Sequence, residues 1–139
     1  MTERVAAVDI GTRWNPNVPD ARLLVHDDGE TRLALRPHID DPDQRFVMLV
    51  WHSSFTSRME PPNDEARSGH RLYNSGLREV LWLGEVHESA LIDDLERRNR
   101  VHDRHNPARF ADLRHWIIPL KECTVEVVAR SLVVERRAR

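Results

Sequence analysis

The chain has 139 residues, of which 40% are hydrophobic and 32% are charged, and its formal net charge is −2. This length suits one domain with its own core and is too short for two ordinary domains. The balanced charge gives no support to nucleic-acid binding. The apolar runs fall far short of the roughly 18 residues that a membrane span needs, and a single cysteine, Cys123, excludes a disulfide framework.

The first residues combine acidic side chains with no long apolar run, so we expect no signal peptide and a cytoplasmic location. Every basic residue except Lys121 is an arginine, a bias that favours the high-GC genome of a bacterium. Lysine differs from arginine in being a compact charge whose pKa shifts readily on burial. We therefore keep Lys121 among the candidate functional residues.

Asn and Pro punctuate the start of the chain, which predicts an extended N-terminal arm over residues 1–20 with at most one short strand. Trp14 lies in this arm and is the tryptophan that we expect to be exposed to a partner, whereas Trp51, Trp82 and Trp116 lie in apolar runs and are expected in the core. Residues 21–135 are predicted to form a single domain, followed by a basic tail over 136–139.

The clearest local element is a β-hairpin over 22–36, because Asp28-Gly29 separates two apolar runs. We expect a two-residue type I′ turn, in which both residues take a positive φ. That turn would pair Leu24 with Leu33 and place both leucines, with Leu35, on the core face.

The rest of the domain reads as strands around one helical block. Further strands are expected at 45–55, 79–86, 115–120 and 124–135, with a long loop over 59–76. A helix is expected over 89–101 with Ser89 as its N-cap, and a second, short helix after Asn106 with Pro107 at its first position. The predicted fold is α+β, a mostly antiparallel β-sheet of about six strands with two helices inserted before the last β-hairpin.

The densest group of polar side chains lies in the loop 61–71, whose two prolines stiffen its entry. Asp64, Glu65 and His70 are the acid and base types that general acid–base catalysis needs, and Asn63 and Arg71 could hold a ligand. A structural alternative stays open, in which Asn63 or Asp64 only caps a helical turn.

A second candidate is the turn Lys121-Glu122-Cys123 with Glu126 after it, since charged groups here separate two apolar strands. Lys121 beside Glu122 could orient an acidic ligand or act as an acid–base pair. A nucleophilic Cys123 would need a lowered pKa and a nearby histidine, so a structural thiol is favoured.

Histidines complete the set of candidates. His52 and His115 are added as ligand-binding residues. His102 and His105 have the i, i+3 spacing of helical metal ligands, with a third ligand to come from elsewhere, but surface or capping roles explain them more simply. We expect no metal and no cofactor.

No Gly-rich phosphate loop and no nucleophile, zinc-protease or paired CxxC motif occurs in the sequence. We therefore expect an accessory or binding domain that recognises a small molecule or a protein partner. A homodimer is possible, and neither nucleic acid nor a membrane is expected as a partner. The alternative is a cofactor-free enzyme that uses His70, Asp64, Glu65, Lys121 and Glu122 in a cleft beside the sheet. A deep polar cavity would favour the enzyme and a flat apolar face the partner-binding domain.

Overall fold

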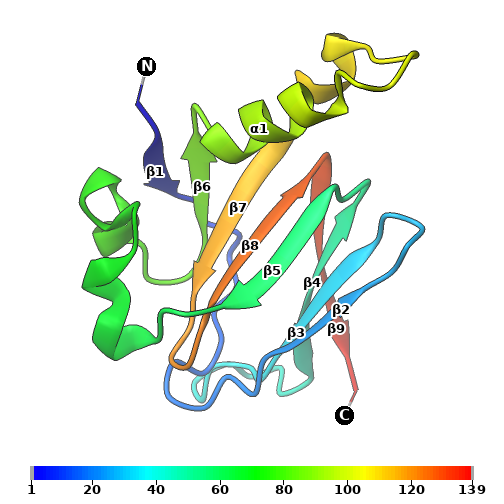
Figure 1. Ribbon diagram of the computed structural model, residues 1–139. Coiled ribbons are helices and arrows are strands. Elements are labelled where there is room, and N and C mark those ends of the chain that lie inside the picture. Colours follow the sequence, from blue (N-terminus) through cyan, green and yellow to red (C-terminus); the bar gives the residue numbers. More distant parts are fainter. Residues whose placement is uncertain (1, 139) are drawn as a thin grey trace.

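The computed structural model describes residues 2–138, and within them nine strands form two antiparallel sheets (Figure 1). The five-stranded sheet has the order β1 (Arg4–Ala7), β6 (Gly84–His87), β7 (Arg114–Pro119), β8 (Thr124–Ala129) and β5 (Thr56–Glu60). The four-stranded sheet has the order β2 (Arg22–Val25), β3 (Thr31–Leu35), β4 (Phe46–His52) and β9 (Ser131–Arg137). The mostly antiparallel α+β class is confirmed, but the expected number of about six strands is wrong.

The strand number differs because one predicted strand divides between the sheets and another is followed by a strand that is not predicted. The run 45–55 becomes β4, which is followed across residues 53–55 by β5 in the other sheet. The run 124–135 breaks at Arg130 into β8 and β9 in the same way. The two bends are bonded together, since Phe55 N–H donates to the Val128 carbonyl (2.7 Å) and Arg130 N–H donates to the His52 carbonyl (3.2 Å). At the second bend, apolar residues resume directly after Arg130 and Ser131, so the apolar pattern does not mark a change of sheet there.

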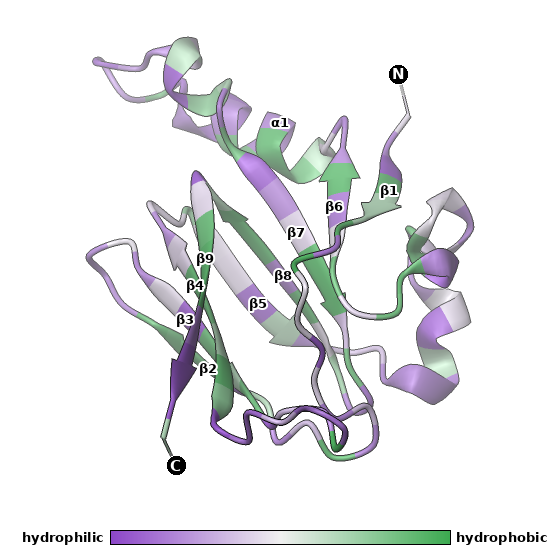
Figure 2. Ribbon diagram, turned by 180° about the vertical axis from the view of Figure 1, so that it is seen from behind, coloured by the Kyte–Doolittle hydropathy of each residue, from purple (hydrophilic) through white to green (hydrophobic). Residues whose placement is uncertain are grey.

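The main core lies between the two sheets. Alternate residues of each strand point inward, so the apolar side chains of β3, β4, β7 and β8 meet there. Figure 2 shows how β9 changes from hydrophobic to hydrophilic towards its C-terminal end, where it leaves this core. Trp51 and Trp116 are buried in the core, as expected. Trp14 is also buried, with 1% of its surface exposed, so the expectation that it faces a partner is wrong.

Trp14 is buried because the N-terminal arm packs along the domain. Strand β1 pairs with β6, and an isolated bridge joins Trp14 to Pro37. The Asn15 N–H also donates to the Arg36 carbonyl at 2.9 Å. Sequence punctuation correctly indicates irregular backbone here but carries no signal of these long-range contacts.

The helical segments cover the outer face of the five-stranded sheet. One α-helix, α1 (Ala90–Asn99), lies over one end, and the 3₁₀ segments η1 (Asp64–Gly69), η2 (Tyr73–Ser75) and η3 (Leu77–Glu79) lie at the side (Figure 1). The second predicted helix is a single 3₁₀ turn, η4 (Pro107–Phe110), although Asn106 caps it as expected. Within residues 2–138, no helix is long and apolar enough to cross a membrane.

The predicted hairpin forms, but its loop has three residues, Asp27, Asp28 and Gly29. Gly29 N–H donates to the His26 carbonyl at 3.2 Å, and His26 N–H donates to the Glu30 carbonyl at 2.9 Å. Gly29 has a φ of +92°, whereas Asp28 does not have a positive φ, so the expected type I′ turn is wrong. A three-residue loop that ends in a left-handed glycine is the next most common hairpin connection.

The extra loop residue shifts the register by one position. Leu23 pairs with Leu33 and packs on the core, while Leu24 pairs with Arg32 and is 54% exposed. The expected pairing of Leu24 with Leu33 is therefore wrong. Because side chains alternate between faces, a slip of one residue exchanges the buried and exposed leucines.

This register predicts different costs for two neighbouring substitutions. Leu23→Ala should lower the free energy of unfolding by about 2 kcal/mol because it removes core contacts. Leu24→Ala should change it by less than about 0.5 kcal/mol. Urea unfolding of both variants measures the difference, and a larger loss at Leu24 would contradict the register.

Gly29 provides a second test of the hairpin. Gly29→Val should cost about 1–3 kcal/mol, since a β-branched residue would be held at a positive φ. An added Cβ would meet its nearest neighbour, Ser53 Cα, at an ordinary 3.6 Å, so the cost is one of backbone strain. Gly69→Val is the matched control because Gly69 has open space around it. Equal melting temperatures for the two variants would rule out the strained turn.

Candidate functional site

The loop 61–71 is fixed against the turn that follows β7. Asn63 accepts a hydrogen bond from Ala66 N–H (3.1 Å), so its predicted capping role is confirmed. The Asp64 N–H donates to the Lys121 carbonyl at 2.8 Å, and Arg67 Nη2 donates to the Leu120 carbonyl at 3.1 Å. The two sequence-predicted polar segments therefore lie side by side.

Loop and turn meet at a cavity of about 460 Å³, here named the loop cavity. Asp64 and Lys121 line it and face each other, with Lys121 Nζ 3.5 Å from Asp64 Oδ2. Its lining is Trp14, Pro16, Asn17, His38, Asp64, Arg67, Val80, Leu81, Trp82, Pro119 and Lys121. It is a half-open hollow bordered by the arm, the loop and the turn, which are distant in sequence.

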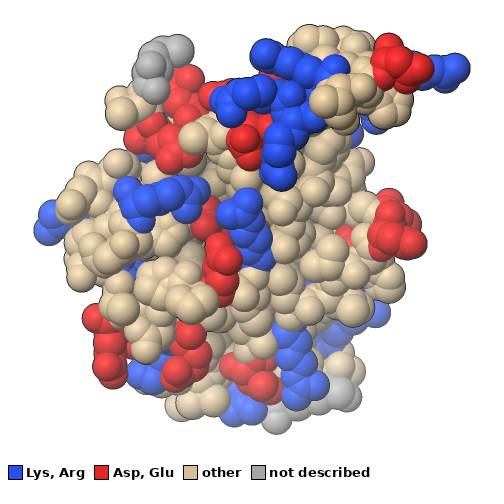
Figure 3. Space-filling view, viewed as in Figure 1, with Lys and Arg blue, Asp and Glu red and all other residues tan. Residues whose placement is uncertain are grey.

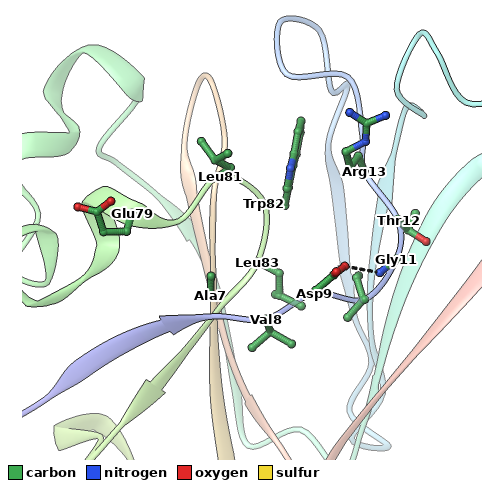
Figure 4. Close-up of a pocket in the computed structure, with 11 residues that line it drawn as sticks. Ala7, Val8, Asp9, Gly11, Thr12, Arg13, Glu79, Leu81, Trp82 and Leu83 are labelled. Atoms are coloured by element: carbon green, nitrogen blue, oxygen red, sulfur yellow. Dashed lines mark hydrogen bonds between the residues drawn. The ribbon is translucent and has the colours of Figure 1, made fainter.

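Trp82 forms one wall of the loop cavity and also lines a second cavity of about 510 Å³, the arm cavity. Figure 4 shows its ring standing between the side chains of Leu81 and Arg13. The indole is held edge-on by Trp14, with ring centroids 5.7 Å apart, and by His38, at 6.1 Å. These contacts fix the ring while leaving it half-buried, so the prediction that Trp82 lies within the core is met only in part.

The lining of the loop cavity carries one more positive than negative charge. Arg67 and Lys121 are cations and Asp64 is the carboxylate. His38 Nδ1 accepts a hydrogen bond from the Asp40 N–H at 3.1 Å, which in the neutral ring leaves the proton on Nε2. The cavity therefore offers hydrogen-bond donors beside apolar aromatic walls.

The other end of the loop turns into the outer face of the five-stranded sheet. There Arg71 makes two hydrogen bonds, at 3.0 and 3.3 Å, to the buried carboxylate of Glu126 in β8. His70 Nε2 lies 3.5 Å from Glu126 Oε2, and His115 Nε2 of β7 lies 2.9 Å from Oε1. Three predicted site residues, His70, Arg71 and His115, thus converge on Glu126.

The pKa of Glu126 reflects this environment. Burial raises the pKa of the carboxyl group, but hydrogen bonds from His115 and Arg71 and the charge of Arg71 outweigh burial and hold the pKa well below its usual range. Glu126 is therefore a carboxylate at neutral pH, with only 3% of its surface exposed.

An ionised carboxylate can only accept hydrogen bonds, which fixes the donors around it. His115 Nε2 must carry a proton, and in the neutral form of the ring Nδ1 then accepts a hydrogen bond from Ser89 Oγ, 2.8 Å away. Ser89 Oγ also accepts from Ile92 N–H (3.1 Å) as the predicted N-cap of α1. His70 Nδ1 accepts the Leu72 N–H at 3.0 Å, which directs its Nε2–H toward Glu126.

Glu3 closes these contacts into a ring. Its Oε1 accepts the Ala90 N–H at 2.6 Å, and its Oε2 lies 4.0 Å from Arg71 Nε. The polar ring, as we name it, consists of Glu3, Arg71, Ser89, Ala90, His115 and Glu126. Elsewhere on this face acidic and basic side chains are interspersed (Figure 3).

The remaining predicted residues line neither the loop cavity nor the polar ring. Glu65 lines a neighbouring hollow of about 310 Å³, which shares Asp64 and Arg67 with the loop cavity, and Glu122 is exposed. His52 is exposed at the end of β4, 4.0 Å from Glu30. Burial raises the pKa of the Cys123 thiol, and the charge of Glu122 adds to this, which disfavours a thiolate nucleophile.

The two histidines with metal-ligand spacing are engaged otherwise. His102 Nδ1 accepts the Arg104 N–H at 2.9 Å. His105 lies between Asn99 (2.9 Å) and Glu96 (3.0 Å). In the part of the chain from 2 to 138, no group of three or more His, Cys, Asp or Glu side chains is arranged to hold a metal ion.

Sequence reasoning missed Trp82, His38 and Arg67 as cavity residues and gave Ser89 only a capping role. Trp82 sits in an apolar run that reads as core, and His38 in an acidic turn. Only the tertiary fold brings them together. Comparison with known proteins finds no family model, no curated protein and no solved structure that matches this chain.

The buried carboxylate gives a pH-dependent prediction. Glu126→Gln should lower the free energy of unfolding by about 3 kcal/mol at pH 7, because it removes one partner from a buried ion pair. The folded-state pKa of Glu126 lies well below the unfolded value of about 4.3, so the stabilisation is fully present above the unfolded value and is lost progressively as the pH falls from there towards the folded-state pKa. The difference in the free energy of unfolding between variant and wild type should therefore narrow below about pH 4.

Urea unfolding between pH 3 and pH 7 measures this gap. Glu122→Gln serves as the control, since an exposed carboxylate should change stability by less than about 0.5 kcal/mol. A gap that stays constant over this range would show that the charge of Glu126 does not stabilise the fold.

Proposed function

We propose that the protein is a binding domain for a small organic anion with a flat apolar group, held in the loop cavity against Trp82. The observation that carries the proposal is the meeting of loop 61–71, the turn at Lys121 and a half-buried indole around one cavity. Its volume of about 460 Å³ lies within the range of small-molecule sites, roughly 300–1,000 Å³.

The charges support an anionic ligand. Lys121 and Asp64 are 3.5 Å apart and their side chains are 40% and 38% exposed, so water screens their attraction. A ligand carboxylate can therefore recruit the Lys121 ammonium group at little cost. Arg67 uses one nitrogen on the Leu120 carbonyl, and its planar guanidinium suits a carboxylate or a phosphate.

The walls support a flat apolar portion. Trp82 is the accessible ring, while Trp14 and His38 hold it edge-on. Because two neighbouring rings restrain the indole, a planar ligand can stack on it with little further loss of conformational freedom. Leu81, which is 76% exposed, adds an apolar rim.

Binding is favoured over acid–base catalysis because the candidate catalytic groups are dispersed. His70 is directed to Glu126, whereas Asp64 pairs with Lys121, and Glu65 lines the neighbouring hollow rather than the loop cavity. General acid–base chemistry needs such groups within reach of one substrate atom. A protein partner and a homodimer stay predictions.

Indole-3-acetate is a suitable probe because it joins a flat ring to a carboxylate. It should shift the indole N–H signal of Trp82 in a ¹H–¹⁵N NMR titration, and this signal is identified by its loss in Trp82→Leu. Lys121→Gln should weaken binding on the order of fivefold, the factor given by about 1 kcal/mol of ion pairing. Neutral indole-3-acetamide should bind more weakly and be insensitive to Lys121→Gln.

Arg98→Gln removes an exposed charge on α1 and is the matched control, with unchanged affinity expected. Equal affinities for the acid and its amide would reject the anion preference. If neither probe shifts the Trp82 signal at millimolar concentration, the loop cavity is not a site for this ligand class.

A further inference from the structure

Ser89, His115 and Glu126 form a hydrogen-bonded chain that the proposed function does not use. Ser89 Oγ lies 2.8 Å from His115 Nδ1, and His115 Nε2 lies 2.9 Å from Glu126 Oε1. All three residues are buried, with exposures of 6%, 0% and 3%. In the neutral ring the order hydroxyl, imidazole, carboxylate is the one that activates a serine as a nucleophile, here with Nδ1 rather than Nε2 facing the serine.

Capping of α1 accounts for only part of this arrangement. Acceptance of the Ile92 N–H uses a lone pair of Ser89 Oγ, but the hydroxyl proton is directed to a buried imidazole. A buried ionic cluster is often replaceable by apolar residues of similar volume without loss of stability. Holding the outer layer therefore needs a filled, well-paired site here but does not by itself dictate a serine, a histidine and a carboxylate in this order.

The backbone around Ser89 also suits a reactive serine. Strand β6 ends at His87, Glu88 takes a φ of +56°, and α1 begins at Ala90. This sharp turn between strand and helix places the serine oxygen beside the first N–H groups of the helix. Such N–H groups stabilise negative charge that develops on a substrate oxygen.

A carboxylate already occupies that position. Glu3 Oε1 accepts the Ala90 N–H at 2.6 Å, so a negatively charged oxygen sits next to Ser89. The Glu3 carboxylate is in turn 4.0 Å from Arg71, which also binds Glu126. The side chains of Glu3 and Arg71 thus lie over the Ser89–His115–Glu126 hydrogen bonds. Both can move by rotation about their own side-chain bonds, without unfolding a strand or a helix.

We propose that Ser89 is the nucleophile of an esterase-type site that Glu3 covers, with carboxylic esters as the substrate class. Ser89 Oγ forms a bond to the ester carbonyl carbon while its proton passes to His115 Nδ1, and Glu126 stabilises the imidazolium. The bond to the alcohol oxygen breaks and His115 returns the proton to that oxygen. Water then cleaves the acyl–serine bond with His115 as the base, which releases the carboxylic acid and restores Ser89.

Labelling of the full chain with a fluorophosphonate tests this proposal directly. The serine oxygen displaces fluoride from phosphorus, and mass spectrometry of the digested protein locates the adduct. We expect one adduct, on Ser89, formed slowly in the wild type and faster in Glu3→Ala. Glu65→Ala is the control for loss of an acidic side chain and should label at the wild-type rate.

His115→Gln separates a reactive serine from a structural one. The Gln amide can still donate to Glu126 but cannot act as a base, so the labelling rate should fall about 100-fold or more in the Glu3→Ala background. Circular dichroism establishes that each variant is folded, and a folded Ser89→Asn variant, which keeps a capping oxygen, should carry no adduct. Equal labelling rates for wild type and Glu3→Ala would show that Glu3 does not cover Ser89.

Absence of an adduct on Ser89 in both wild type and Glu3→Ala at pH 8 would overturn the proposal. A labelling rate unaffected by His115→Gln would also overturn it. Neither result bears on ligand binding at the loop cavity, since none of these substitutions lies in its lining.

Discussion

The buried carboxylate of Glu126 is the interaction on which the arrangement of the outer layer depends. Removing a charge from water costs several kcal/mol, so the folded chain must supply donors that compensate for the lost hydration. His115, His70 and Arg71 supply them from a neighbouring strand and from the end of the loop 61–71. Through Ser89 and Glu3 the same network extends to α1 and to the N-terminal arm.

The loop cavity follows from this constraint. Its loop is held at one end by the Glu126 carboxylate and at the other by the carbonyl groups of Leu120 and Lys121. Between these two attachments, Asp64 and Arg67 line the loop cavity with Trp82. The strands β7 and β8 thus position both the polar ring and the loop cavity, one near each end of the same loop.

Local chemistry predicts part of this structure from the sequence. The caps at Asn63, Ser89 and Asn106 act over three residues or fewer, and each is confirmed. The hairpin is predicted, but its register is not, because Asp27-Asp28-Gly29 supports a loop of either two or three residues. Strand β5 is not predicted because Thr56–Glu60 is mostly polar and lies between the predicted strand 45–55 and the predicted loop 59–76.

The candidate site shows the same limit. Loop and turn are recognisable as polar segments between apolar ones, but their convergence depends on the pairing of β5 with β8, which sets Glu60 opposite Thr124. Glu126 and His115 alternate with apolar residues in their strands, so their outward direction was readable. Nothing local indicated that a helix and a loop would cover that face and bury the two side chains.

Amide hydrogen exchange in Glu126→Gln at pH 7 tests most directly whether this carboxylate holds the outer layer on the sheet. The account predicts that two amides lose protection: Leu72 N–H, which donates to His70, and Ile92 N–H, which donates to Ser89. Amides that pair β3 with β4 in the other sheet should keep their protection from exchange, apart from the part set by global unfolding. Unchanged protection of Leu72 and Ile92 would contradict the account.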